Sequence, residues 1–394
     1  MADPWLFLIG IGEDGLSGLS SASRDALATA DIVFGGERHL ALADAGTRGR
    51  LWPVPFTVAP VLACRGRRVA VLASGDPFWH GAGGSLAAHL EPGEWLTFPQ
   101  PSTFSLAAAR LGWRLEDVLC IGLHAAPFEI LIPHLTPELR VISLVRDGAA
   151  VPDFASWLTG HGFGATHLRV MEALGGPRER IRTARADEFD LKDAIAPVAV
   201  AFIAAGGAGI ARVVGMPDDV FAHDGQITKR PVRALTLSAL APRQGELLWD
   251  IGAGSGSISV EWCLAGGRAI AIEARPDRVL NIRSNAAAFG LEKRMTIVEG
   301  HAPEALTGLP APAAIFVGGG GDAGLIGAVW AAMRAGSRLV VNAVTLETET
   351  LLVHWQEKHG GELLRLEFSR AQPIGGSRGW VPSRPVVQWS VAKC

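Results

Sequence analysis

The sequence is poor in cysteine, and it has no excess of basic residues. The four cysteines, Cys64, Cys120, Cys263 and Cys394, show no CxxC spacing. We therefore expect no disulfide framework and no metal site, and the composition fits a reducing cytoplasm. The formal net charge of −3 argues against a nucleic-acid partner, because nucleic-acid-binding domains usually carry a basic patch or stripe.

Targeting signals and long apolar runs are also missing. The N-terminal residues have no basic region, and their apolar run ends at Glu13, which is unlike a secretory signal peptide. Residues 194–211 form an uncharged run of 18 residues, but this run contains Pro197 and little Leu or Ile. We interpret it as a buried strand that runs into a loop, and we expect no membrane span.

The composition provides enough apolar residues for two buried cores. Hydrophobic residues make up 48% of the 394 residues and charged residues 19%, while 48 glycines and 24 prolines indicate many tight connections. In the N-terminal half, short apolar strands alternate with helical stretches, among them 21–30, with Ser21 as its cap, and 103–111. This alternation predicts an α/β fold with parallel sheets. The predicted strands are 6–10, 32–34, 69–73, 118–121, 141–145, 167–171 and 198–203.

A change of composition near the middle of the chain predicts a domain boundary. Residues 205–216 are rich in glycine and alanine, and a polar stretch follows. We therefore place a first domain at 1–208 and a second at 216–394. The second domain begins with a predicted helix at 231–241, followed by strands and helices in alternation. Its last strand is expected to be antiparallel, because a Gly/Arg-rich loop instead of a helix precedes it. The seven predicted strands are 247–251, 269–273, 296–299, 313–317, 338–341, 363–367 and 386–391.

A glycine-rich loop follows the first strand of the second domain. The loop is Asp250-Ile-Gly-Ala-Gly-Ser-Gly, with glycines spaced GxGxG instead of the GxGxxG of dinucleotide-binding loops. Asp250 would meet a pyrophosphate unfavourably, whereas adenosylmethionine carries an ammonium and a sulfonium. Glu273 ends the next strand, where a carboxylate can accept the hydroxyl groups of a ribose. The pattern favours an adenosylmethionine site, and the alternative is a loop that only turns the chain.

This segment resembles a known family. The loop with its following Ser-Ile-Ser-Val-Glu, the stretch Ile227-Thr-Lys-Arg-Pro-Val-Arg and the stretch Val341-Asn-Ala-Val-Thr-Leu-Glu are similar to the decarboxylating precorrin methyltransferases of cobalamin biosynthesis. The resemblance covers about residue 216 to the C-terminus and implies a seven-stranded Rossmann-like methyltransferase sheet. It also implies that the residues that contact adenosylmethionine are Thr228, Asp250, Gly252, Ala253, Gly254, Ser255, Gly256, Glu273, Gly300, His301 and Ala302.

A second glycine loop lies near the N-terminus. Gly10-Ile-Gly12 follows an apolar strand, 69–78 ends in a Gly-Asp-Pro turn, and Pro101-Ser-Thr opens an alanine-rich helix. Together these segments resemble the tetrapyrrole methylases, a two-lobed α/β family whose loop usually reads GxGPGD, although here Glu13 replaces the proline. The alternatives are a strand-ending turn at Gly12 and a turn-stabilising role for Asp76. The resemblance implies cofactor contacts by Gly10, Gly12, Asp76, Ser102 and Thr103.

The two resemblances together imply a bifunctional enzyme. A tetrapyrrole methylase domain fused to this Rossmann-type domain is expected to bind one adenosylmethionine per domain. The implied reaction is the methylation of precorrin-6B at carbons 5 and 15, with decarboxylation of the ring C acetate to give precorrin-8. In the family the N-terminal domain methylates carbon 5, and related Rossmann-type domains are often tetrameric, so we expect a homo-oligomer.

Polar residues near these segments are candidates for substrate contacts. The substrate carries many carboxylates, so cationic side chains are expected in its cleft, with ordinary surface charges as the alternative. The candidates for substrate binding are Lys229, Arg230, Arg233, Arg378 and Arg384. The candidates for catalysis are His124 and three residues that follow the fifth strand of the second domain, Asn342, Thr345 and Glu347, because such sheets build their sites at the carboxyl ends of strands.

Two other functions compete with this hypothesis. One is a nicotinamide-dependent precorrin reductase, against which the GxGxG spacing and Asp250 argue. In the other, the N-terminal domain is a non-catalytic tetrapyrrole carrier, an idea motivated by the altered loop after Gly12. Counting the methyl groups that the full chain adds would separate the carrier from the bifunctional enzyme.

Overall fold

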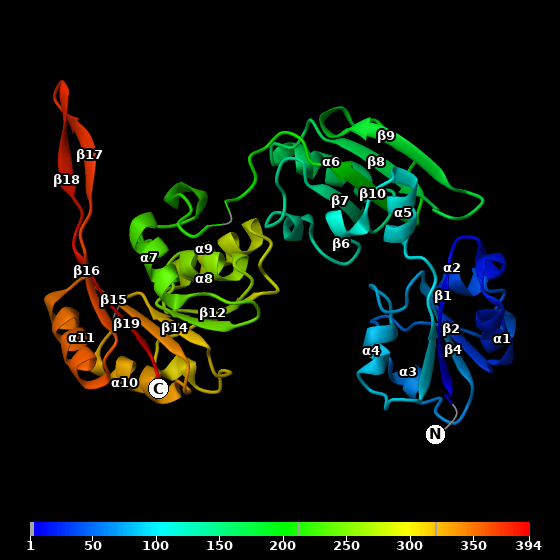
Figure 1. The fold of residues 1–394 in the computed structure, drawn as a ribbon, viewed down its shortest axis with the longest axis horizontal. Coiled ribbons are helices and arrows are strands. Elements are labelled where there is room, and N and C mark those ends of the chain that lie inside the picture. The colour runs from blue at the N-terminus through cyan, green and yellow to red at the C-terminus, as the bar shows by residue number, and fades with distance from the viewer. Residues whose placement is uncertain (1–3, 212, 320) are drawn as a thin grey trace. The chain divides into compact units, whose positions relative to one another are not determined.

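The structure is a computed structural model that describes residues 4–211, 213–319 and 321–394. The chain folds into two compact units, Met1–Phe128 with Leu135–Gly209 (unit 1) and Glu129–His134 with Ile210–Cys394 (unit 2). Over the described ranges, no helix is both long enough and apolar enough to cross a lipid bilayer. Each unit has its own buried core and is described below by itself (Figure 1).

The first sheet of unit 1 has five parallel strands in the order β3-β2-β4-β1-β5. The central strands β1 and β4 are apolar and buried on both faces, as expected for a parallel sheet covered by helices. The cap of the first helix is Ser20, whose Oγ accepts from Ser23 N at 3.1 Å, and not Ser21 as predicted. The elements are β1 Leu6–Ile11, α1 Ser21–Thr29, β2 Ile32–Gly35, α2 Glu37–Leu42, β3 Gly49–Leu51, α3 Ala59–Leu62, β4 Val69–Ser74, α4 Gly83–Ala87 and β5 Trp95–Phe98.

The second sheet of unit 1 is mixed. Its order is β6-β7-β10-β8-β9, in which only β6 and β7 run parallel. The prediction of parallel sheets was therefore wrong for this sheet. The charged strand β9 pairs antiparallel with β8 through a short connection, and its polar sequence hides it from an apolar search. The elements are α5 Thr103–Leu111, β6 Leu119–Gly122, β7 Arg140–Leu144, α6 Ala150–Gly160, β8 His167–Glu172, β9 Arg180–Arg185 and β10 Val198–Ile203.

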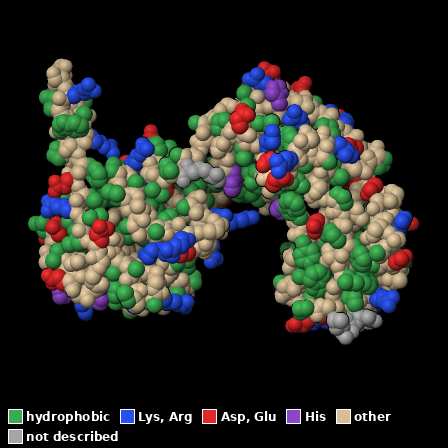
Figure 2. Space-filling view, in the orientation of Figure 1, with side chains coloured by type: hydrophobic (Ala, Val, Ile, Leu, Met, Phe, Trp, Pro, Cys, Tyr) green, Lys and Arg blue, Asp and Glu red, His purple; other side chains and the backbone are tan. Residues whose placement is uncertain are grey.

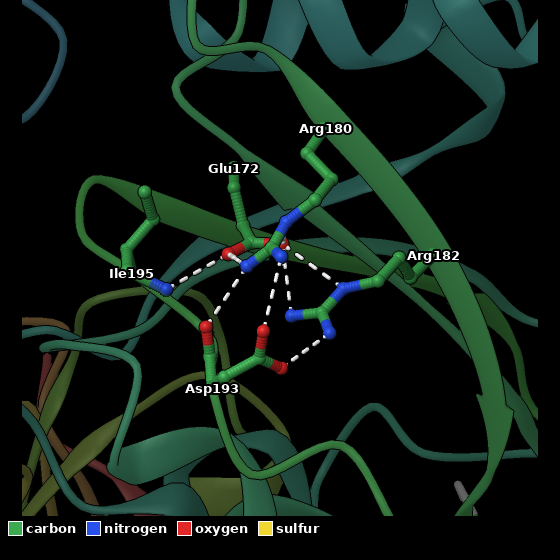
Figure 3. Close-up of polar contacts among 5 residues, drawn as sticks. All are labelled: Glu172, Arg180, Arg182, Asp193 and Ile195. Carbon is green, nitrogen blue, oxygen red and sulfur yellow. Dashed lines mark hydrogen bonds and ion pairs between the residues drawn. The ribbon is translucent and has the colours of Figure 1, made fainter.

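A buried carboxylate holds the end of β8 (Figure 3). Glu172 accepts from Arg180 Nη2 at 2.7 Å, from Arg182 Nη2 at 3.1 Å and from the Ile195 amide at 2.8 Å, and Asp193 pairs with both arginines. Burial raises the pKa of Glu172, but these partners outweigh burial and hold the pKa below its ordinary value. The cluster ties β8, β9 and the segment before β10 together.

Unit 2 contains one seven-stranded sheet in the order β13-β12-β11-β14-β15-β19-β16. Strands β15 and β16 both pair antiparallel with β19, so the predicted antiparallel end is confirmed. Helices α7, α8 and α9 contribute to the core on one face, and α10 and α11 to the core on the other. The elements are α7 Arg230–Leu240, β11 Leu247–Ile251, α8 Ser257–Leu264, β12 Arg268–Glu273, α9 Pro276–Ala288, β13 Met295–Glu299, β14 Ala314–Val317, α10 Ala323–Ala332, β15 Arg338–Ala343, α11 Leu346–His359, β16 Glu362–Leu366 and β19 Val386–Ala392.

The predicted Gly/Arg-rich loop before β19 is a β-hairpin instead. Strands β17 Ser369–Ile374 and β18 Ser377–Pro382 pair antiparallel over their whole length, and apart from Gly379 all their residues are exposed. Figure 2 shows hydrophobic side chains (green) on this hairpin. Ile374 on β17 and Trp380 on β18 have exposed fractions of 61% and 75%. The strand sequences Ser-Arg-Ala-Gln-Pro-Ile and Ser-Arg-Gly-Trp-Val-Pro mix polar residues, glycine and proline, so the period of two that marks a strand is not evident.

Candidate cofactor sites

The glycine loop of unit 2 connects β11 to α8. Gly252, Gly254 and Gly256 have φ angles of +69°, +61° and +72°, in the left-handed region that favours glycine. A Cβ atom on Gly256 would lie 3.0 Å from the Ile282 side chain, and one on Gly254 would lie 3.3 Å from the carbonyl oxygen of Gln226. Side chains at these glycine positions would crowd the neighbouring atoms. The main chain of the loop therefore stays uncovered, as close approach of a ligand requires.

The carboxylate of Glu273 lies beside this loop. Its side chain belongs to a residue that is 5% exposed, and its two oxygens accept from Gly254 N at 2.8 Å and from Arg275 N at 3.0 Å. The Glu273 carbonyl accepts from Gly300 N at 3.0 Å, which brings the turn after β13 next to the end of β12. The structure thus brings together three of the predicted segments at the carboxyl edge of the sheet.

Asp250, at the end of β11, carries a buried and half-satisfied carboxyl group. Its Oδ2 accepts from Ser259 N at 3.1 Å and from Ser259 Oγ at 2.6 Å, while its Oδ1 and the buried Oγ of Ser255 have no hydrogen-bond partner among the described residues. An unsatisfied buried acceptor next to a glycine loop fits a ligand that brings donors and positive charge. Adenosylmethionine, with its ammonium and sulfonium, meets this requirement.

The environment of Asp250 has a consequence for stability. Burial raises its pKa from 3.8 to about 6, against the hydrogen bonds from Ser259, and the charge of Glu273 adds to the rise. Because the pKa of the folded state lies above the ordinary value, this group stabilises the fold fully only below about pH 4 and loses that contribution as the pH rises through about 6. At neutral pH the ionised carboxylate of Asp250 therefore destabilises the fold, which is common for charged groups that serve in ligand binding.

The other predicted cofactor residues of unit 2 lie on connecting segments. Thr228 precedes α7 and is half-buried, and its carbonyl accepts from Arg233 Nη1 at 2.5 Å. Gly300 and Ala302 are half-buried, whereas the side chain of His301 is exposed in the turn after β13. Thr228 lies on the segment that approaches the glycine loop at Gly254. Gly300, His301 and Ala302 lie on the turn whose Gly300 N bonds to the end of β12.

The cationic candidates separate into exposed residues and one core residue. Lys229, Arg230, Arg378 and Arg384 are exposed, the last two on β18 and just after it. Arg233 is fully buried, and it donates to Glu261 at 2.7 Å, to Asp218 at 2.9 Å and to two backbone carbonyls. The expectation that Arg233 binds substrate is therefore corrected, since its guanidinium is enclosed and its donors are used inside the fold.

The three residues predicted to follow the fifth strand, of which Asn342 lies within β15, also have different surroundings. Asn342 is 8% exposed, and its amide bonds to Thr236 Oγ1 at 3.0 Å and to Gln388 Nε2 at 2.9 Å, so the structure places it in a buried triad that links α7, β15 and β19. Its amide thus has partners inside the fold, and its catalytic role stays a prediction. Thr345 caps α11 through Thr348 N at 3.3 Å, and Glu347 follows in its first turn, both exposed at the carboxyl edge of the sheet.

The glycine loop of unit 1 lies between β1 and α1. A Cβ atom on Gly10 would lie 1.8 Å from the carbonyl oxygen of Gly75, so only glycine allows the ends of β1 and β4 to approach this closely. A cavity of about 40 Å³ lies beside these strand ends. Its lining includes Gly12, Gly75 and Thr103, which brings together the three segments that the sequence analysis selected.

Two of the predicted cofactor residues of unit 1 have local structural roles. Asp76 Oδ1 accepts from Phe78 N at 2.8 Å, which is the turn-stabilising arrangement considered as its alternative. Ser102 is buried and caps α5, accepting from Ser105 N at 3.1 Å. Neither arrangement uses all the hydrogen-bonding capacity of the side chain.

A charged group that the sequence analysis missed lies in the same cavity wall. Glu13, which takes the place of proline in the usual loop, is 9% exposed and pairs with Arg38 and, at 3.2 Å, with Arg178. Arg38 also donates to Ser74 Oγ at 2.6 Å, and burial together with Arg38 lowers the pKa of His39 to about 4. The altered residue was visible in the sequence, but its partners lie far away along the chain.

The last candidate, His124, follows β6. Its ring lies 5.8 Å from that of His80, edge to face, and burial and the neighbouring His80 lower its pKa. His124 is therefore neutral near pH 7 and can accept a proton. Over the described residues, no group of three or more His, Cys, Asp or Glu side chains is placed to hold a metal ion.

Two family models match separate parts of the chain. Residues 6–190 match the family described as Tetrapyrrole (Corrin/Porphyrin) Methylases, and residues 219–393 match the Precorrin methyltransferase domain. A precorrin-6Y C(5,15)-methyltransferase (decarboxylating) from Sinorhizobium sp is 48% identical over 404 residues, which cover 100% of this chain and 97% of the relative. The chain belongs to the precorrin-6Y C(5,15)-methyltransferase (decarboxylating) family.

Two further relatives are informative. An enzyme of the same name from Mycobacterium tuberculosis is 41% identical over 401 residues, which cover 98% of this chain and 100% of the relative. A probable cobalt-precorrin-6B C(15)-methyltransferase (decarboxylating) from Pyrobaculum aerophilum is 35% identical over 181 residues, 44% of this chain and 92% of the relative. As a member of this family, the chain is a methyltransferase. The expectation that it is an enzyme of this family is therefore confirmed.

Proposed function

We propose that this chain methylates precorrin-6B at carbons 5 and 15 and removes the carboxyl group of the ring C acetate, giving precorrin-8, with adenosylmethionine as methyl donor. The identity of 48% over the whole chain to a relative named for both methylations carries the proposal. The two glycine loops, each at the carboxyl ends of parallel strands, support one cofactor site in each domain.

We assign the reactions to domains 1–208 and 216–394. The relative from Pyrobaculum aerophilum is named for carbon 15 and decarboxylation alone, and its 181 matched residues amount to 44% of this chain. Carbon 15 methylation and decarboxylation therefore fit within one domain. We assign them to 216–394, which leaves carbon 5 methylation to 1–208.

The chemistry places modest demands on the side chains. Adenosylmethionine, when bound, supplies a methyl group on a positively charged sulfur, and a bridge carbon of a reduced precorrin is already nucleophilic. The protein must hold both partners in line and exclude water, which rigid main-chain loops do well. Asp250 and Glu273 would hold the cofactor in the second domain, and the main chain at Gly10, Gly12 and Thr103 in the first.

The substrate carboxylates would be bound by exposed cations. Lys229 precedes α7 and Arg230 begins it, next to Thr228, and Arg378 and Arg384 lie on or just after β18. Thr345 and Glu347 at the carboxyl edge of the sheet, and His124 in the first domain, are the candidates for handling a proton.

We also propose that the chain is a homo-oligomer. A two-stranded hairpin alone is at best marginally stable in water, yet β17 and β18 expose Ile374 at 61% and Trp380 at 75%. Burial of these side chains by a second copy would stabilise the hairpin. A monomeric mass by light scattering would contradict the proposal, while Trp380→Asp is expected to shift an oligomer toward smaller species.

The reaction itself is tested by mass spectrometry of the product formed from precorrin-6B and adenosylmethionine with a labelled methyl group. We expect a gain of two labelled methyl groups and the loss of one carboxyl group. A gain of one methyl group would favour the carrier alternative for the N-terminal domain, and no gain would refute the proposed function.

A further inference from the structure

The segment 215–228, which we call the strap, precedes α7 and lies beside the glycine loop of unit 2, since Asn285 bonds to both. Its first residues are held by the buried Glu261, which accepts from Gly215 N at 2.5 Å and from Met216 N at 3.0 Å. Its last residue, Thr228, is held through its carbonyl by Arg233. The buried Arg233–Glu261 pair thus fixes both ends of the strap, which accounts for an arginine in the core.

The side chain of Asn285, on α9, binds the middle of the strap. Asn285 is 2% exposed, its Oδ1 accepts from Ala222 N at 2.8 Å, and its Nδ2 donates to Ala222 O at 3.0 Å. The same Nδ2 donates to Ser255 O, in the glycine loop, at 2.8 Å. One amide therefore joins the strap and the loop.

One further ion pair holds the strap. Arg278, on α9, pairs with Asp224 of the strap at 2.9 Å. The strap also lies close to the loop, since a Cβ on Gly254 would come within 3.3 Å of the Gln226 carbonyl. Ser255, which Asn285 holds through its carbonyl, is the residue whose buried Oγ has no partner among the described residues. Asn285 therefore bonds directly to the residue that carries this unpartnered hydroxyl.

We propose that Asn285 is a positioning residue for the cofactor site of unit 2. Its amide couples the strap, with Thr228, to the glycine loop, so that both keep the conformation that binds the adenosyl group. The inference rests on the proposed function of this loop as an adenosylmethionine site. It predicts that loosening the strap weakens cofactor binding in a chain that is still folded.

The test is calorimetric titration of the full chain with S-adenosylhomocysteine. The binding event that Glu273→Ala weakens is assigned to the site of unit 2. Asn285→Ala loses its bonds to Ser255 and Ala222, and we expect about tenfold weaker binding at that site, with the other site unchanged. Hydrogen exchange of the strap should speed up, and the ligand should protect it less than in the wild type.

A matched control removes a buried polar group from the opposite edge of the sheet. Ser337, 4% exposed, donates to Pro312 O at 3.1 Å and accepts from Arg334 N at 3.2 Å. We expect Ser337→Ala to lower the midpoint of thermal unfolding while its affinity stays within twofold of the wild type. A merely structural role for Asn285 predicts the same behaviour for Asn285→Ala.

The outcomes separate the inference from the proposed function. Wild-type binding with an Asn285→Ala affinity within twofold of it would overturn the inference and leave the function intact, whereas no wild-type binding at unit 2 would overturn the function. If Asn285→Ala does not fold, the partly exposed Arg278–Asp224 pair provides a second test. Arg278→Gln should weaken S-adenosylhomocysteine binding about twofold to fivefold and speed hydrogen exchange of the strap. Unchanged affinity and unchanged exchange in that variant would also overturn the inference.

Discussion

Replacement of Glu273 by alanine tests the unit 2 site most specifically. The change removes the acceptor of Gly254 N and Arg275 N, two amides at 2.8 and 3.0 Å from a carboxylate on a 5% exposed residue. A buried donor left without its partner costs about 1–3 kcal/mol, and the ligand loses a carboxylate acceptor as well. We expect the dissociation constant for S-adenosylhomocysteine to rise about 5- to 150-fold.

The assay is calorimetric titration of the folded full-length chain, with Glu292→Ala as the control. Glu292 is an exposed carboxylate just before β13, so the control makes the same change of charge away from the loop. Glu273→Gln keeps one acceptor oxygen and should fall between alanine and the wild type. An alanine variant that binds as tightly as the control would refute the assignment of Glu273 to the cofactor.

Other predictions follow from buried charges. Asp250→Asn should raise stability by on the order of 3 kcal/mol at pH 7.5 and by little at pH 4, measured by chemical unfolding, while it weakens cofactor binding; no gain at the higher pH would contradict the raised pKa. Arg233→Ala should cost about 3–5 kcal/mol of unfolding free energy, because it strands the buried Glu261, and a loss below about 1 kcal/mol would contradict a core role. The partners of Glu172 hold its pKa low, so its carboxylate stabilises the fold above the ordinary pKa of 4.5, and this contribution is lost as the pH falls through the pKa of the folded state. Glu172→Gln should therefore reduce the loss of unfolding free energy at acid pH. An unaltered dependence of the unfolding free energy on acid pH would contradict the role of the cluster. Asp76→Ala should yield product with one added methyl group, measured by mass spectrometry. Product with two added methyl groups would show that Asp76 only stabilises its turn and does not serve the cofactor.

Much of the fold could be predicted from apolar runs. The strands 6–10, 198–203 and 247–251 are buried in parallel or central positions, so their sequences are almost continuously apolar and easy to recognise. Strand β9 was missed because it is half-buried and rich in arginine, and β18 because it is almost entirely exposed; the pairing of each depends on neighbours that a single segment does not reveal.

The candidate site could be predicted where local sequence determines it. A glycine loop and the acid at the end of the next strand have a fixed spacing, so Gly252 and Glu273 were selected from the sequence, and the structure brings them together. Arg233 was misinterpreted because it follows Lys229 and Arg230, which suggested a basic patch. Its helical spacing to the buried residues Thr236, Leu237 and Leu240 was the signal that it faces the core.

Contacts between distant segments could not be predicted. Glu13 meets Arg38 and Arg178, and Asn285 meets residues 222 and 255, at separations that no local pattern encodes. Such contacts arise only once the sheets bring the ends of their strands to one edge.

The central claim is that this chain binds two molecules of adenosylmethionine at separate sites. Its most direct test is the stoichiometry of S-adenosylhomocysteine binding to the full chain by calorimetry. We predict two molecules per chain, of which Glu273→Ala weakens one. One molecule per chain would contradict a cofactor in each domain, and a Glu273→Ala titration identical to that of the wild type would contradict the placement of the second site.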